Sequence, residues 1–543
     1  MWRSTGVLRP WHVGRDTVEN SGSPKGSMRR ILEMVHYTSE MLSFNPWSEN
    51  CRRDGETLHA DGMSYQAYYS EVGKAHYTSA RGISCADKGK DLTEVRSSQR
   101  KLVPDIVGLE PYEPTSLRGI AIKAKESAKY RFQDLYRLLN APFLMYCWMD
   151  LNKNAASGVD EVTAEAYQEN LEGNIQNLEK RLKDKRYRAK LVRRCYIPKD
   201  IGKERPLGIP ALEDRLLQLA CAKILTSIFE SDFVETSYGY RPNRSAKEAI
   251  EDLQFNLQFG KYGYIVEADI KGFFDNLDHE WLLRMLRERI DDGAFLNLVR
   301  KWLKAGILDT DGKILHPETG TPQGGIISPV LANVYLHFVL DLWFEKRVKT
   351  NCKGETFILR YADDFICAFR YRDEAKRFYQ ELPKRLNQFH LSVAAEKTKL
   401  IRFSRFHPGM QRQIVFLGFE TYWMNDANGN ARVEQRTARK KLRSACSRIK
   451  EWIKLNRHLK GKAFIDALNR RLRGHYSYYN VPGNLSSLGR FYHWTIGCAF
   501  KWLNRRGGKR KSFTWEAFSK AIDLLGIAKP KMVVVNRQHR VFA

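Results

Sequence analysis

The sequence lacks the cysteine spacing of a zinc site, and it lacks long apolar runs. Its nine cysteines are scattered, and no two of them stand at C-x-x-C spacing, which disfavours a zinc site. An odd, dispersed set of cysteines is typical of a reducing compartment. No stretch approaches the roughly 20 apolar residues that a membrane-spanning helix needs. The sequence therefore predicts neither secretion nor a membrane span.

Acidic residues are also in short supply. The 543 residues include 62 Asp and Glu against 91 Lys and Arg, which gives a formal net charge of +29. Such an excess favours a polyanionic partner, because each neutralised phosphate releases counterions and adds affinity. A merely soluble basic protein, or one of the ribosomal kind, is the alternative that charge alone leaves open. Hydrophobic residues make up 43% of the chain, enough for a large core and more than one domain.

Regular apolar patterns begin near residue 116. Residues 1–115 are rich in Ser, Gly, Glu and Tyr and show weak periodicity, so we expect a poorly ordered or irregular extension. Helical spacing then appears over 118–150 and 161–186, and a strand is predicted at Arg194–Pro198. After residue 422, basic residues dominate helical patterns over 431–480, which predicts a basic helical domain.

Strands and helices of unequal length alternate through the middle of the chain. This alternation predicts an α+β fold with helices packed on one face of a sheet. The predicted strands cover 263–270 and a hairpin over 356–369, and the predicted helices cover 211–230, 279–290, 324–345 and 372–389.

Three aspartates stand where predicted strands end. Asp269 closes one strand, and Asp363 and Asp364 lie at the turn of the hairpin. Because successive strand residues point to opposite faces, adjacent aspartates serve one site only where a strand breaks into a turn. Nucleotidyl transfer needs two divalent cations, one for the attacking 3′-hydroxyl and one for the leaving pyrophosphate. Mg²⁺ takes oxygen ligands and keeps some waters, so two or three carboxylates suffice.

A pair of acids at a turn is common, but the blocks around it are more specific. Over roughly 120–480, the sequences of these blocks and their order along the chain resemble those of the reverse transcriptases. The blocks are, in order, RPLGIP (205–210), YGYRPNRSAKEAI (238–250), DIKGFFDNLDH (269–279), TPQGGIISP (321–329), YADD (361–364) and FLGFE (416–420).

The resemblance implies a right-hand polymerase, in which fingers and a palm with an antiparallel sheet precede an α-helical thumb or maturase domain. It also implies that the three aspartates are catalytic and bind two Mg²⁺ ions. The expected domains are an extension (1–115), an N-terminal block and fingers (116–260), a palm with the catalytic hairpin (261–422), a helical thumb or maturase domain (423–490) and a basic C-terminal module that binds nucleic acid (491–543).

Four further residues are implied to contact the incoming dNTP. Arg205 would bind its triphosphate, because a planar guanidinium matches phosphate oxygens. Lys199 would help, although a solvated loop lysine is an equal alternative. Gln323 would line the pocket. Phe273 would be the steric gate, an aromatic ring that leaves no room for a 2′-hydroxyl, with Phe274 as the neighbouring alternative.

Basic and aromatic residues outside the aspartate site are implied to bind RNA or the template. A basic helical surface grips an A-form duplex largely by shape, and exposed aromatic rings stack on unpaired bases. Some of these rings are equally suited to the core. The predicted residues are Arg241, Arg439, Lys440, Arg443, Arg471, Arg473 and Tyr478.

Two further blocks resemble the group II intron branch of this family. LNKNAASGVDEVTAEAYQENLE (151–172) is similar to its additional N-terminal block, and RLRGHYSYYN (471–480) to its maturase helix. The resemblance implies RNA-directed DNA synthesis joined to intron splicing and to mobility by target-primed reverse transcription. Many members end in an HNH endonuclease with paired cysteines and histidines, which we do not expect here.

The implied partners are group II intron RNA, an RNA template, a DNA primer or target DNA, and dNTPs. No association with a membrane is expected. Formation of a homodimer is left as an open alternative. The expected location is the bacterial cytoplasm, in a ribonucleoprotein or at the nucleoid. Two alternatives remain, a domesticated reverse transcriptase in phage defence or CRISPR spacer acquisition, and a splicing cofactor with secondary polymerase activity.

Overall fold

A computed structural model describes residues 115–200, 203–321, 323–408, 412–505 and 512–531. The predicted extension therefore lies, apart from Thr115, outside the described residues. Helices and strands are mixed, as the α+β prediction requires. No helix among the described residues is long and apolar enough to span a membrane.

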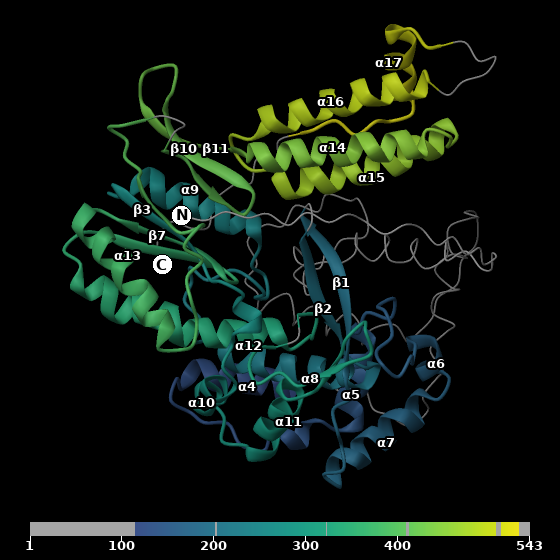
Figure 1. Ribbon diagram of the computed structural model, residues 1–543, viewed down its shortest axis with the longest axis vertical. Helices are drawn as coiled ribbons and strands as arrows, with labels where there is room; N and C mark the ends of the chain where they lie inside the picture. Colours follow the sequence, from purple (N-terminus) through teal and green to yellow (C-terminus); the bar gives the residue numbers. More distant parts are fainter. Residues whose placement is uncertain (1–114, 201–202, 322, 409–411, 506–511, 532–543) are drawn as a thin grey trace, which may run out of the picture.

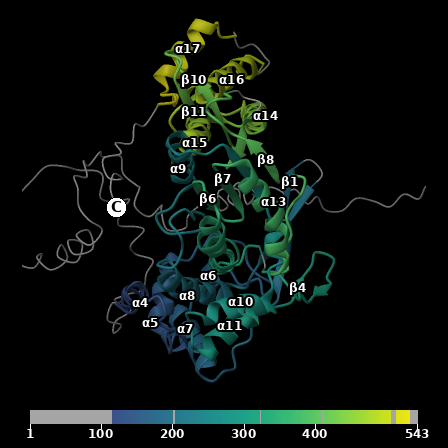
Figure 2. The same ribbon diagram turned by 90° about the vertical axis from the view of Figure 1, so that its left-hand side faces the viewer.

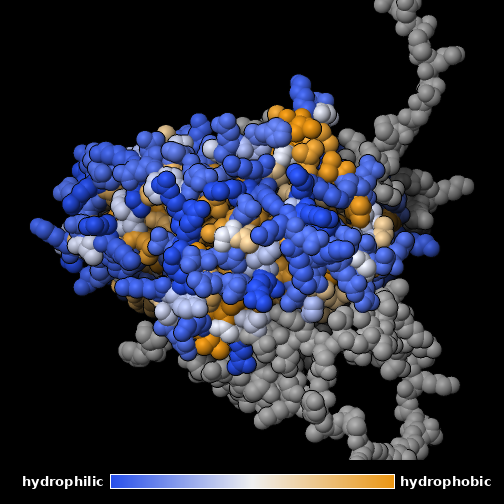
Figure 3. All heavy atoms as spheres, turned by 90° about the horizontal axis from the view of Figure 1, so that it is seen from below, coloured by the Kyte–Doolittle hydropathy of each residue, from blue (hydrophilic) through white to orange (hydrophobic). Residues whose placement is uncertain are grey.

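Helices form the lower part of the molecule around the long buried helix α8 (Leu212–Phe229) (Figure 1). Seen from below, this part presents mostly hydrophilic side chains, with hydrophobic ones between them (Figure 3). The helices that share its apolar core include α4 (Thr115–Glu126), α5 (Ala141–Asp150), α6 (Ala164–Gln168), α7 (Leu171–Lys183), α10 (His279–Arg287) and α11 (Gly293–Leu303).

The helical spacing over 118–150 does not form one helix. Helix α4 ends at Glu126, and α5 begins at Ala141. The Asn140 side chain accepts the Phe143 N–H at 3.0 Å, and Pro142 stands in the first turn of α5. These are start signals, so the chain begins a new helix there.

A hairpin of β1 (Val192–Asp200) and β2 (Lys203–Ile209) rises from this helical part (Figure 1). Strand β1 also pairs in parallel with β4 (Ile307–Leu308), which continues to β5 (Ile314–Leu315). The RPLGIP block thus lies mainly in strand β2.

The central antiparallel sheet has the order β6-β7-β3-β8, and helices cover both of its faces. In β7, Phe365, Cys367 and Phe369 face one apolar core, whereas Ile366 and Ala368 face another. The prediction of helices on one face is therefore wrong, and an unbroken apolar strand is the pattern of two-sided burial. The strands are β3 (Tyr264–Asp269), β6 (Thr356–Tyr361), β7 (Asp364–Phe369) and β8 (Lys399–Arg402), with α12 (Ser328–Leu336) and α13 (Arg372–Asn387) on one face and α9 (Ala246–Phe259) on the other.

A second antiparallel sheet and a helical bundle complete the chain, and the bundle lies at the end opposite α8 in both views (Figure 1, Figure 2). The predicted boundary at 422 falls inside β10, and that at 490 falls inside α16. Residues 512–531 share one apolar core with the preceding helices, so they are not a separate module. The elements are β9 (Ile414–Phe416), β10 (Phe419–Asn425), β11 (Ala431–Thr437), α14 (Arg439–Asn456), α15 (Gly461–Tyr479), α16 (Leu485–Leu503) and α17 (Trp515–Leu524).

Candidate functional site

Two neighbouring strands of the central sheet carry acidic residues at the same end. Asp269 is the last residue of β3, and it lies directly opposite Asp364, the first residue of β7. Asp363 precedes Asp364 in the turn between β6 and β7. Residues directly opposite in an antiparallel pair have Cα atoms about 4.5–5.5 Å apart. The structure therefore brings the three predicted aspartates together.

The turn that carries Asp363 has an unusual backbone. Ala362 has a φ of 57°, in the left-handed region that non-glycine residues rarely adopt. Gly239 packs directly on this turn, because a Cβ there would overlap the backbone nitrogen of Ala362. Strained backbone of this kind persists only where the surroundings fix it, and it gathers at functional sites.

A buried ion pair supports the same turn. The Arg360 guanidinium donates to both carboxylate oxygens of Asp341, at 2.8 and 2.6 Å, and the two side chains are only 1% and 0% exposed. Arg360 Nη1 also donates to the Ala362 carbonyl at 3.0 Å and to Asn333 Oδ1 at 2.9 Å. Asn333 in turn donates to the Gly239 carbonyl at 2.7 Å. One connected network therefore holds the turn and the segment packed on it.

A lysine that sequence reasoning missed lies beside the aspartates. Lys397 Nζ forms an ion pair with Asp269, and this contact raises the pKa of the lysine. The segment before it follows the end of β3, because the Ala394 N–H donates to the Asp269 carbonyl at 2.8 Å. The pairing of β8 and of the segment before it with β3 and its continuation brings Lys397 here, and no local pattern of the sequence signals that pairing.

The pKa of Asp364 is raised to about 7. Desolvation by the surrounding protein is the main cause, the like charges of Asp363 and Asp269 add to it, and Lys397 acts in the opposite direction. The Asp364 side chain is nevertheless exposed. Protein surrounds the carboxylate on most sides, and one side of it remains open to solvent. A cation brought to that open side would relieve the repulsion between the carboxylates.

The aspartates suit a Mg²⁺ ion that arrives with a substrate. Among the described residues, no three His, Cys, Asp or Glu side chains are already arranged as a metal site. Mg²⁺, however, commonly takes one or two carboxylates together with waters and substrate phosphates rather than a closed protein cage. Three neighbouring carboxylates, one of them partly desolvated by the protein, offer that donor set.

The raised pKa of Asp364 predicts that the metal-free protein loses stability between pH 3.8, the ordinary value, and about 7. Across this range the folded state keeps a proton that the unfolded state has lost, so the free energy of unfolding falls as pH rises. We expect Asp364→Asn to raise the thermal midpoint relative to wild type more at pH 8 than at pH 5. An equal difference at both pH values would contradict the assignment.

The sequence from 197 to 421 matches the family described as reverse transcriptase (RNA-dependent DNA polymerase). Protein YkfC of Escherichia coli is 32% identical over 370 residues, which cover 60% of this chain and 93% of that protein. Group II intron-encoded protein LtrA of Lactococcus lactis is 40% identical over 235 residues, 42% of this chain. The chain belongs to the reverse transcriptases of the group II intron branch.

The chain covers only part of some relatives in this family. The match spans 38% of the length of the lactococcal protein and 31% of the putative COX1/OXI3 intron 1 protein of Saccharomyces cerevisiae, which is 29% identical over 260 residues. Among solved structures, telomerase from Candida albicans matches with a TM-score of 0.37 and 15% identity, over 63% of this chain and 62% of that one.

Three of the four residues predicted to contact the dNTP lie on β1, β2 and the loop beside them; they are Lys199, Arg205 and Gln323. Arg205 is half-buried on β2, and the Gly208 N–H of the same strand donates to the Gln323 carbonyl at 2.6 Å. Gly324 has a φ of 115°, and a Cβ there would come within 2.5 Å of the Gly208 carbonyl oxygen. Close backbone packing therefore fixes the Gln323 loop beside β2. Lys199 lies in β1, but its side chain is outside the described residues.

Sequence reasoning also missed Tyr240, whose hydroxyl is influenced by the charges of both Arg205 and Asp363. Burial raises the pKa of the Tyr240 hydroxyl; the charge of Asp363 adds to this rise, and the charge of Arg205 opposes it. Both charges are thus within electrostatic reach of one ring. Tyr240 follows Gly239, which packs on the turn that carries Asp363, and the sequence marks it only as part of the YGYRP block.

Exposure reverses the predicted order of the two adjacent phenylalanines. Phe273 is 2% exposed, and its ring packs against Tyr335 at 6.3 Å between ring centroids, within the core. Phe274 is only partly buried. The prediction of Phe273 as the ring beneath a sugar is therefore wrong, because a 3-10 turn at Phe273–Asp275 directs that ring inward.

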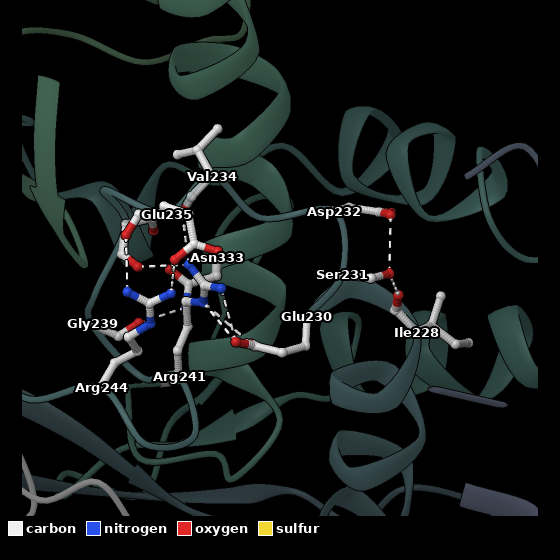
Figure 4. A network of polar contacts seen from close by, with 11 residues as sticks. Ile228, Glu230, Ser231, Asp232, Val234, Glu235, Gly239, Arg241, Arg244 and Asn333 are labelled. Atoms are coloured by element: carbon white, nitrogen blue, oxygen red, sulfur yellow. Dashed lines mark hydrogen bonds and ion pairs between the residues drawn. The ribbon is translucent and has the colours of Figure 1, made fainter. Parts of the chain in front are cut away.

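Arg241 is likewise buried rather than free to bind RNA. It is 2% exposed, and its guanidinium donates to Glu230 at 2.8 Å and to the carbonyls of Val234 and Ser237 at 2.7 Å each. Figure 4 shows it beside Arg244, which pairs with Glu235 in the same network. These partners satisfy Arg241, so the template-binding prediction for it is wrong.

The other predicted RNA-binding residues divide into two groups. Arg471 lies over the Trp452 ring at 4.1 Å from its centroid, and the Tyr478 hydroxyl donates to the Leu417 carbonyl at 2.9 Å. Both therefore take part in packing within the protein. The exposed members are Arg439, Lys440, Arg443 and Arg473.

Proposed function

We propose that this chain is an RNA-directed DNA polymerase that also acts as a maturase, binding group II intron RNA to assist splicing and mobility. The observation that carries the proposal is the meeting of three aspartates at the joined ends of β3 and β7 in a chain of this family. We assign the N-terminal block and fingers to 116–260, the palm to the sheet region from 261 onward, and the thumb or maturase region to the helices that follow β11. Its substrates are then dNTPs, an RNA template and a DNA primer.

The proposed mechanism gives each group one task. Two Mg²⁺ ions, when bound, would activate the primer 3′-hydroxyl and neutralise charge on the leaving pyrophosphate. Asp269, Asp363 and Asp364 supply their carboxylate ligands, and the buried Arg360 network keeps the turn in place. Arg205 binds the triphosphate of the nucleotide, whose base lies against the Gln323 loop.

Primer extension and splicing test this proposal together. The protein would be supplied with an RNA template, a DNA primer, dNTPs and Mg²⁺, and separately with the RNA that flanks its gene. We expect DNA synthesis and protein-dependent splicing. Synthesis without splicing would instead support a domesticated enzyme, and splicing without synthesis would support a splicing cofactor.

Phe274 is our proposed steric gate. Its removal should let ribonucleotides enter, because the ring would no longer fill the space that a 2′-hydroxyl needs. A pocket that discriminates by one hydroxyl in this way contributes a factor of roughly 10². We therefore expect Phe274→Ala to raise the ratio of rNTP to dNTP incorporation by about that factor, measured by single-nucleotide extension. The matched control is Phe273→Leu, which should leave the ratio unchanged; a change in the control alone would reverse the assignment.

A further inference from the structure

A buried histidine holds the backbone at the start of the Gln323 loop. His279 is the first residue of α10 and is 5% exposed. Its Nε2 lies 2.6 Å from the Gly320 carbonyl oxygen, and because a carbonyl can only accept, this nitrogen carries the proton. The Gly320 N–H in turn donates to the Leu277 carbonyl at 2.7 Å. The peptide groups on both sides of Gly320 are therefore bound to the segment that leads into α10.

The same part of the loop is hydrogen-bonded to the residues that surround the proposed steric gate. The Thr321 N–H donates to the Phe274 carbonyl at 2.8 Å. The Thr319 hydroxyl donates to the Asp275 carbonyl at 3.1 Å. These two contacts and the two at the glycine between them form the His279 clamp, which joins the start of the loop to the backbone that carries the Phe274 ring.

The loop continues from the clamp to the strand that carries Arg205. The Gly208 N–H of β2 donates to the Gln323 carbonyl at 2.6 Å, and Arg205 lies earlier on the same strand. Beyond this point, the Ile326 N–H donates to the buried Gln218 side chain at 3.0 Å. One stretch of backbone, held at its start, middle and end, therefore connects the proposed steric gate with the residue proposed to bind the triphosphate.

The clamp is distinct from the contacts that hold the aspartates. Asp269 is placed by the pairing of β3 with β7, and the turn that carries Asp363 is held by Arg360. The bonds of the clamp start at Phe274, after β3 has ended. Loss of the clamp should therefore move the walls of the nucleotide pocket and leave the carboxylates in place.

We infer that His279 is a positioning residue for nucleotide selection, because it fixes the spacing between the Phe274 ring and the Gln323 loop. The inference rests on the proposed function and deepens it, since it names a residue that governs the choice between dNTP and rNTP through the backbone. A displacement of about 1 Å in a positioned group can lower a rate roughly 10²-fold, so the loss of one clamp bond should be measurable.

Single-nucleotide extension by the full chain, on an RNA template with a DNA primer, tests this role. His279→Leu leaves the Gly320 carbonyl without its side-chain donor. We expect the KM for dNTP to rise about tenfold with kcat nearly unchanged, because weaker binding of the nucleotide acts on KM. The ratio of rNTP to dNTP incorporation should also rise, because the displaced ring admits a 2′-hydroxyl. His279→Gln should restore both values, since its amide nitrogen can donate in place of Nε2.

The matched control is Tyr136→Phe. The Tyr136 hydroxyl donates to the Leu182 carbonyl at 3.0 Å in the helical part of the molecule, so this variant also loses one hydrogen bond to a backbone carbonyl. It should lower the thermal midpoint and change neither KM nor the incorporation ratio. A rise of the ratio in this control would show that general loss of stability, and not the clamp, relaxes selection.

A double variant tests whether His279 acts through the gate. Phe274→Ala combined with His279→Leu should give the incorporation ratio of Phe274→Ala alone, because a ring that has been removed cannot be displaced. Effects on the ratio that multiply would show that the two residues act independently and would overturn the inference.

The remaining outcomes separate the inference from the proposed function. If wild type extends the primer and His279→Leu changes kcat alone, or changes nothing, the positioning role is overturned and the proposed function stands. If His279→Leu does not fold, Thr319→Val decides, because it removes an exposed donor of the clamp. A raised ratio in that variant would support the inference, and an unchanged ratio would overturn it. A wild-type protein that does not extend the primer would overturn the proposed function, and the inference with it.

Discussion

Replacing Asp363 with Asn should slow DNA synthesis about a thousandfold while leaving nucleic-acid binding nearly unchanged. The substitution keeps the size of the side chain and removes one of the charges that gather where β3 and β7 meet. Metal-assisted charge stabilisation contributes several kcal/mol to a transition state. A loss of about 4 kcal/mol lowers the rate roughly 10³-fold. Single-nucleotide extension on an RNA template would measure the loss, and equilibrium binding of the same duplex would measure what remains.

The control for this substitution is Asp311→Asn. Asp311 is an exposed aspartate between β4 and β5 that pairs with Lys313. Its replacement by Asn changes the net charge by the same amount and leaves the three aspartates of the candidate site untouched. Its extension rate should match that of wild type. Wild-type synthesis by the Asp363→Asn variant would show that Asp363 takes no part in the reaction. Equal losses in the Asp363 and Asp311 variants would indicate an effect of net charge.

The aspartates could be predicted from the sequence because the features that mark them, a strand end and a hairpin turn, are local in the chain. Carboxylates at a strand end and at a hairpin turn need only the alternation of side chains along a strand. The register that places Asp269 opposite Asp364 could not be predicted, because those residues lie far apart in the chain and no local signal sets their pairing. Lys397 was missed for the same reason.

Burial was the other property that the sequence could not supply. The FF pair presents two identical rings, and only the 3-10 turn that follows Gly272 decides which of them enters the core. Arg241 belongs to a block rich in charge and resembles a surface residue, yet Glu230 and two carbonyls take up its guanidinium. In both cases the outcome depends on tertiary partners, which override the character of the residue type.

The second large effect should come from the buried pair of Arg360 and Asp341, which lies outside the proposed catalytic residues. Replacing Arg360 with Met leaves the Asp341 carboxylate buried without its partner. Breaking a buried pair in this way costs roughly 3–5 kcal/mol of unfolding free energy. Denaturant unfolding would measure this loss. A cost within a few tenths of a kcal/mol would show that the pair is not buried as described.

A double variant separates the stability of the fold from the position of the turn. Replacing both partners, as Arg360→Met with Asp341→Leu, removes both charges, and such apolar replacements are often neutral for stability. The unfolding free energy should therefore recover most of what the single variant lost. Synthesis should not recover, because the Ala362 carbonyl and Asn333 still lack the guanidinium that held the strained turn. Recovery of both stability and synthesis would mean that apolar packing is enough to position Asp363. The ion pair would then have no role in holding the turn.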